Sequence, residues 1–185
     1  MLVKALIQIG LGRASAEQLA KQIAAGDPDA KKTGALLQQM ATRMQAAGVP
    51  AKKQAAILEE AAARRLTDAS PGGAADGLVG RVLIAELVGE RTAALLRPGS
   101  NAGLVASALF EGISQLDNTA VAGAGRQAAI DDIVSGGLSG DAAKGRVGGA
   151  IIEDLVGKPD AALLPAGTDK LAVAGALLDA TAGLQ

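Results

Sequence analysis

Carboxylates are the side chains of this sequence best suited to chemistry, and they occur as adjacent pairs in segments predicted to be helical. The pairs are Glu59-Glu60, Asp131-Asp132 and Glu153-Asp154. Carboxylate oxygens bind Mg²⁺, so two pairs on facing helices would make a magnesium site. Neighbouring residues of a helix point about 100° apart, however, so one pair alone cannot make a site. We therefore expect these pairs to lie on solvated helix faces.

The composition excludes most other catalytic chemistry. The 185 residues include no His, Cys, Trp or Tyr. Without His there is no imidazole general base, and without Cys there is neither a thiolate ligand nor a disulfide, which leaves the redox compartment open. No glycine-rich segment ends in Gly-Lys-Ser/Thr, and residues 121–125 follow a predicted helix, so we interpret them as a linker. The sequence nominates no catalytic, cofactor-binding or metal-binding residue, and it predicts a protein that is not an enzyme.

Basic residues also occur in pairs, at Lys31-Lys32, Lys52-Lys53 and Arg64-Arg65. The net charge is −1 and no aromatic side chain accompanies these pairs, which disfavours nucleic-acid binding. Residues 17–23 have a pattern found in helix-turn-helix motifs, but any amphipathic helix gives it. The charge is unevenly spread: residues 1–70 carry ten basic and six acidic side chains, and residues 71–185 carry eight and thirteen.

The apolar residues favour packed helices over sheet. The chain has 42 Ala, 25 Gly and 24 Leu, against one Phe. Alanine is the best helix former, and small side chains let helices approach closely. No apolar stretch is long enough to span a bilayer. The opening residues 1–16 contain only a short apolar run, so we expect a first helix there and no signal peptide. The compartment stays open.

Capping and breaking residues place the helices. Ser15 to Gln18 fits a capping box for a helix that ends at Gly26. Asp27-Pro28 fits an N-cap for a helix that ends at Gly48, and Pro50 opens a helix that runs through Ile57, Leu58 and Leu66. Residues 70–73 form a loop. Later helices are expected at 76–88, 101–116, 144–156 and 169–184, with short helical turns at 95–96 and 163–164.

Two glycine patterns carry further expectations. Gly89 and Gly157 each follow Leu-Val and precede polar residues, so we expect both to end helices in the left-handed conformation. Gly145 and Gly149 stand four residues apart on one predicted helix, and this spacing favours a close helix crossing.

An internal duplication is the strongest signal in the chain. A shift of 68 positions aligns residues 70–117 with 138–185 without a gap, and 20 of the 48 pairs are identical. A shift of 73 aligns residues 34–60 with 107–133, where eight of 27 pairs are identical. The pattern predicts a truncated first unit (1–49), a second unit (50–122) and a third unit (123–185). The alternative is one duplication preceded by an unrelated helical segment.

These observations predict an all-α fold of short helices in two to three diverged repeats of about 70 residues. Short helices are marginally stable alone, so the units must bury their apolar faces on one another. A helical-repeat array and a closed multi-helix bundle both satisfy that requirement.

The fold and the missing chemistry together favour a structural role. We expect a self-associating building block of a filament, shell or particle, which forms a head-to-tail homo-oligomer. The alternatives are a monomeric helical-repeat adaptor that binds a peptide or protein, and a carboxylate and Mg²⁺ enzyme on a helical scaffold. Neither nucleic acid nor a cofactor is expected as a partner.

Overall fold

The computed structural model describes residues 1–119, 121 and 123–182. This part of the chain is all-helical, as the sequence predicts, and contains no strand. None of its helices combines the length and the apolar character that a membrane span requires. The helices are α1 (Leu2–Gln8), α2 (Arg13–Ala24), α3 (Pro28–Ala46), α4 (Ala51–Ala63), α5 (Ala74–Ala93), α6 (Ala102–Asn118), α7 (Gly123–Gly136), α8 (Gly140–Val156), α9 (Lys158–Ala161) and α10 (Lys170–Ala182).

The chain divides into two compact units. Unit 1 comprises Met1–Gly89 and Asn101–Gly103, and unit 2 comprises Glu90–Ser100 and Leu104–Gln185. Unit 1 therefore holds α1 to α4 and most of α5, whereas unit 2 holds most of α6 and the helices from α7 to α10. Residues 183 and 184, the last two of the expected final helix, lie outside the described residues.

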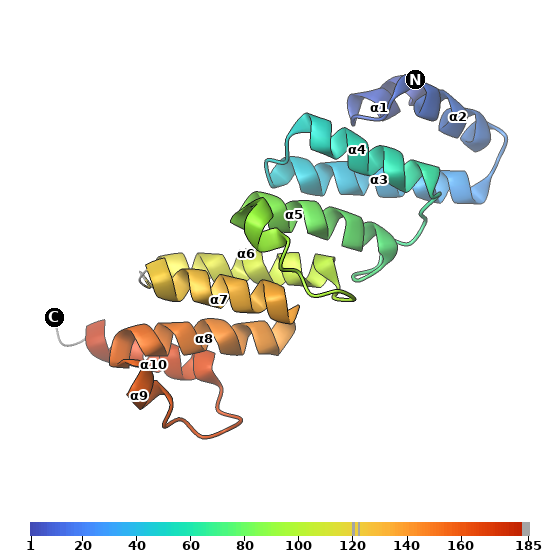
Figure 1. The fold of residues 1–185 in the computed structure, drawn as a ribbon. Coiled ribbons are helices and arrows are strands. Elements are labelled where there is room, and N and C mark those ends of the chain that lie inside the picture. Colours follow the sequence, from blue (N-terminus) through green and yellow to red (C-terminus); the bar gives the residue numbers. More distant parts are fainter. Residues whose placement is uncertain (120, 122, 183–185) are drawn as a thin grey trace. The chain divides into compact units, whose positions relative to one another are not determined.

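In unit 1, α2 packs against α1, α3 and α4, and α3 and α4 lie side by side (Figure 1). The core is aliphatic, because its largest fully buried side chains include Leu37, Met44 and Leu58. The buried Asp76 of α5 accepts a hydrogen bond from Arg43 of α3 at 2.6 Å, so an ion pair joins these two helices. Apolar packing and ion pairs between helices thus hold unit 1 together.

Four successive helices of unit 1 end in the same way. The second residue after each helix has a positive φ, and its N–H and the next N–H donate back to carbonyls of the last turn, which is a Schellman motif. Glycine holds this position three times, at Gly10, Gly26 and Gly48. The expected ends at Gly26 and Gly48 are confirmed. After α4 the position is held by Arg65 (φ 50), so α4 ends before Leu66, contrary to the expectation.

One predicted helix start in unit 1 is confirmed, and another is wrong. Asp27 caps α3 as expected, because its carboxylate accepts from the N–H groups of Asp29 and Ala30. The capping box at Ser15 is wrong, since α2 begins at Arg13 and its N-cap is Gly12. The Ser15 hydroxyl instead donates to a carboxylate of α4.

In unit 2, α8 packs against α7, α9 and α10. The fully buried side chains of this unit are again aliphatic, and they include Leu109 of α6, Ile133 of α7 and Ile152 of α8. The expected linker at 121–125 is wrong in part, because α7 already begins at Gly123; Ala122 lies outside the described residues. Two glycines in its first turn hid the start of this helix from the sequence pattern.

Each unit contains one glycine where a helix backbone passes too close for a side chain. A Cβ atom added to Gly80 would overlap the backbone of Ala102 and Gly103. A Cβ atom added to Gly148 would lie 2.5 Å from the backbone nitrogen of Leu171. The predicted crossing at Gly145 and Gly149 is therefore wrong in register: Gly148 makes the close approach and Gly145 faces open space.

Gly89 and Gly157 interrupt helices, as expected, but not in the left-handed conformation. Gly89 has φ 82 and ψ 157 inside α5, and Gly157 has φ 85 and ψ 157 between α8 and α9. A positive φ with an extended ψ is a region that essentially only glycine occupies. The helical direction therefore changes at both residues, and a short helical turn follows each.

Candidate functional site

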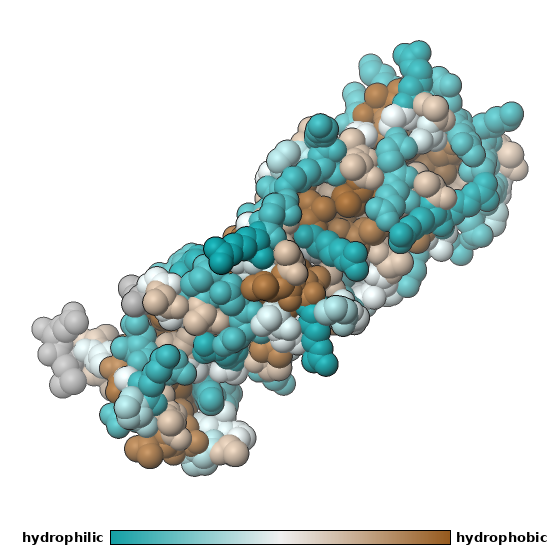
Figure 2. All heavy atoms as spheres, viewed as in Figure 1, coloured by the Kyte–Doolittle hydropathy of each residue, from teal (hydrophilic) through white to brown (hydrophobic). Residues whose placement is uncertain are grey.

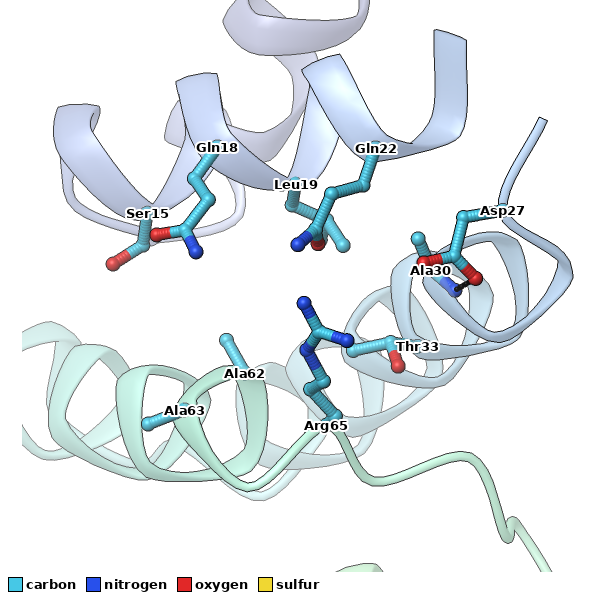
Figure 3. A pocket seen from close by; sticks show the side chains of 10 residues that line it. All are labelled: Ser15, Gln18, Leu19, Gln22, Asp27, Ala30, Thr33, Ala62, Ala63 and Arg65. Carbon is cyan, nitrogen blue, oxygen red and sulfur yellow. Dashed lines mark hydrogen bonds between the residues drawn. The ribbon is translucent and has the colours of Figure 1, made fainter. Parts of the chain in front are cut away.

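A cavity lined by both polar and apolar side chains lies in unit 1, between α2, α3 and the end of α4 (Figure 3). Its volume is about 180 Å³. Figure 3 shows the Arg65 guanidinium and the side chains of Gln18 and Gln22 pointing into the space between the helices. The remaining lining residues are Ser15, Leu19, Asp27, Ala30, Thr33, Ala62 and Ala63.

The backbone conformation of Arg65 directs its side chain into this cavity. Within the described residues, Arg65 is the one non-glycine residue with a positive φ. The left-handed conformation costs a non-glycine residue about 1–2 kcal/mol. The guanidinium forms no hydrogen bond or ion pair with the described part of the chain. Arg65 is exposed to solvent, and its left-handed conformation is accompanied by the two backbone hydrogen bonds of the Schellman motif.

Three neutral polar side chains of the cavity also lack partners among the described residues. Gln18, which is exposed, and Gln22, which is half-buried, stand one helical turn apart on α2, and neither amide is hydrogen-bonded to another described residue. The hydroxyl of Thr33 is buried, with the residue only 2% exposed, and it has no hydrogen-bond partner there. Buried hydroxyls are usually hydrogen-bonded, so Thr33 is an exception that requires an explanation.

Acidic groups stand beside the cavity. Asp27 lines it, and its Oδ1 atom accepts from the two N–H groups that it caps. Glu59 of α4 accepts from the Gly12 N–H through Oε1 at 2.5 Å and from the Ser15 hydroxyl through Oε2 at 2.6 Å. The carboxylate of Glu59 therefore caps the start of α2 from another helix, a role that the sequence did not reveal.

The acidic pairs of the sequence do not converge on one site. Glu60 pairs with Arg64 on its own helix, and Asp132 accepts from Arg146 Nε at 2.6 Å. Asp131 accepts from the Gln127 amide at 2.8 Å. In the described part of the chain, no group of three or more acidic residues could hold a metal ion.

One member of each basic pair, Lys32, Lys53 or Arg64, forms an ion pair. Lys32 lies 3.8 Å from Asp29 and Lys53 lies 2.6 Å from Glu86. Arg65 differs, because it faces the cavity. Sequence reasoning singled out Arg64-Arg65 as a basic pair but did not separate their roles, since the positive φ of Arg65 leaves no signature in the residue type.

Comparison of the chain with models of protein families, with curated proteins and with solved structures gave no match.

Proposed function

We propose that this protein is a structural, self-associating helical building block, assembled from diverged copies of a unit of about 70 residues. The observation that carries the proposal is α10, which is apolar on all sides. Only Lys170 and Asp179 carry charge in this helix of 13 residues. Its substantial contacts within the described residues are with α8 alone, so most of its surface is left uncovered.

Comparison with the aligned helix α6 shows that the apolar side chains of α10 are less well buried. Val105 and Leu109 of α6 are 0% exposed. The residues 68 positions later on α10 are Val173 and Leu177, and both are only half-buried. An uncovered apolar helix favours association, because burial of apolar surface contributes about 25 cal/mol per Å². Repeat arrays that stay monomeric cover such ends with polar residues.

Further apolar surface follows α8 in unit 2. Leu155 at the end of α8 is 36% exposed and Leu163 after α9 is 80% exposed. Figure 2 shows brown apolar surface in the region of α9 and the loop that follows it. Large side chains of this kind are normally buried, and a cluster of them is typical of an interaction surface.

Unit 1 offers a surface that fits such a helix. An apolar groove of about 310 Å³ lies between α1, α2 and α3. It is lined in part by Leu2, Leu6, Ile9, Ile23 and Gly34. Unit 1 carries eleven basic and eight acidic side chains, whereas unit 2 carries seven and eleven. Opposite net charges of +3 and −4 favour head-to-tail contact, in which this groove receives α10 of a second copy.

Similar local geometry supports the proposed duplication. Gly89 and Gly157 share their backbone angles, and Gly80 and Gly148 both stand at close helix approaches. Each of these pairs is separated by 68 positions, the shift that aligns the sequence with itself. We also expect no activity of the common nucleophilic classes, because the side chains that such activity needs are absent from the sequence.

Sedimentation velocity across a concentration series tests the association. We expect oligomers at tens of micromolar protein in low salt, and partial dissociation as salt screens the charges. The double variant Ala172→Glu, Ala176→Glu places charges on exposed positions of α10 and should give monomers. The matched control is Ala51→Glu, Ala56→Glu, which adds the same charge to exposed positions of α4 and should still associate. A strict monomer under all conditions contradicts the proposal.

A further inference from the structure

We propose that the cavity between α2, α3 and Arg65 is a binding site for a small carboxylate that also carries an amine or hydroxyl group. Three of the four Schellman motifs use glycine, which has no steric cost at positive φ. The fourth uses Arg65 and aims its guanidinium at the cavity (Figure 3). Strain of this kind persists at functional sites, where the side chain is needed in that position.

The donors around the cavity define the first half of the ligand. The guanidinium of Arg65 presents parallel N–H groups whose spacing matches the two oxygens of a carboxylate. The amides of Gln18 and Gln22 reach into the same space from α2 and can donate to further oxygens. Arg65 and Gln18 are exposed and Gln22 is half-buried, and none of the three has a partner among the described residues. One planar anion would satisfy them together.

A hydrogen-bond acceptor and an apolar wall of the cavity define the second half of the ligand. Asp27 lines the cavity, and its Oδ1 atom is already occupied by backbone N–H groups, which leaves Oδ2 to accept from a ligand. Leu19 and Ala30 are buried and give the cavity an apolar wall. A ligand with an N–H or O–H group near its carboxylate therefore fits better than a simple fatty acid.

Charge and size disfavour bulkier or more highly charged anions. The carboxylate of Asp27 stands at the cavity, so a doubly charged phosphate would meet repulsion there as well as attraction from Arg65. A volume of about 180 Å³ is below that of pockets for drug-sized ligands, which begin at about 300 Å³. Both features point to a small molecule with a single carboxylate.

Calorimetric titration with glycine, L-alanine and L-lactate tests the site, with acetate and inorganic phosphate as comparison ligands. We expect at least one of the first three to bind with a Kd on the order of 0.1–1 mM. Acetate lacks the donor for Asp27 and should bind more weakly. Absence of binding by all five ligands overturns the proposal, and preferred binding of phosphate overturns the assignment to a carboxylate.

The variant Arg65→Gly separates binding from folding. Glycine restores the residue that the other three helix ends use, so the melting temperature should rise. The same change removes the guanidinium and should lower affinity by about tenfold or more. The control Arg64→Gln removes an equal charge one residue earlier and should leave affinity unchanged. Unchanged affinity in Arg65→Gly, or an equal loss in the control, overturns the proposed site.

Discussion

Gly80 and Gly148 stand 68 residues apart, and in each unit that glycine lies directly against the backbone at the start of the next long helix. Gly80 meets Ala102 and Gly103, and Gly148 meets Lys170 and Leu171. The four partner residues are related by the same shift of 68. A contact between two backbones requires the absence of a side chain, so these glycines define where the helices cross.

Substitution at this crossing should be costly. We expect Gly80→Ala and Gly148→Ala each to lower the free energy of unfolding by about 2 kcal/mol or more, because backbone must move to admit the methyl group. Gly77 and Gly145 provide matched controls, since they are helical and have nothing within 4 Å of an added Cβ atom. Gly77→Ala and Gly145→Ala should stabilise by about 0.5–1 kcal/mol. Urea denaturation measures the stability of all four variants. Equal effects at the contact glycines and at the control glycines would refute the crossing.

The helix breaks at Gly89 and Gly157 should also resist substitution. Alanine is strained at a φ near 80 with an extended ψ, so we expect a loss of about 1–3 kcal/mol at each site. Space is not the limit at Gly89, where nothing lies within 4 Å. Gly175→Ala on α10 is the control, and it should stabilise. Thermal unfolding provides the comparison, and a raised melting temperature in Gly89→Ala would show that no break exists there.

Glu59 should contribute more to stability than its neighbour Glu60. Glu59→Ala removes both the cap on the Gly12 N–H and the partner of the Ser15 hydroxyl, and we expect a loss of about 1–2 kcal/mol. Glu60 forms only an exposed ion pair with Arg64, so Glu60→Ala should cost about 0.5 kcal/mol or less. The denaturant midpoints of the two variants measure this difference in stability. Equal losses would mean that the cap contributes nothing.

The pKa of the Asp117 carboxyl should depend measurably on Arg126. The hydrogen bond from Arg126 Nε, at 2.6 Å, lowers the pKa of the Asp117 carboxyl below its ordinary value. Because the folded-state pKa is lowered, the pair stabilises the fold above the ordinary aspartate range and loses this contribution as pH falls through the lowered pKa. Arg126→Gln should raise the pKa toward its ordinary value, as carboxyl NMR titration would record.

Asp68 provides the internal control in the same titration. The pKa of its carboxyl is also lowered, but the cause is hydrogen bonding to Ser70. Arg126→Gln should therefore leave the pKa of Asp68 unchanged. A parallel shift of both carboxyls would show that the substitution acts through a general change in structure.

Local signals made part of this fold predictable. Asp27-Pro28, Gly26 and Gly48 mark helix ends through the conformation of the residue itself, and the structure confirms all three. The start of α7 was missed because Gly123 and Gly125 are poor helix formers in isolation. In that helix, the burial of Ile130 and Ile133 outweighs the low propensity of the glycines.

The candidate site was hidden for a different reason. Its cavity exists only because α2, α3 and the end of α4 pack together, and sequence spacing does not reveal such packing. Glu59 was assigned to a solvated face, although it caps a helix that begins 46 residues earlier along the chain. Arg65 was grouped with Arg64, although the two adjacent side chains have different surroundings. Contacts between distant segments define all of these roles.

The glycine helix ends also make unit 1 sensitive to chirality. A positive φ is the natural conformation of a D-amino acid, and Gly26 (φ 87) and Gly48 (φ 71) both adopt it. In a chemically synthesised chain, D-alanine at these two sites would restrict the unfolded state while matching the folded backbone. L-alanine at the same sites would work against it. D-alanine would therefore stabilise the same two helix ends that L-alanine destabilises.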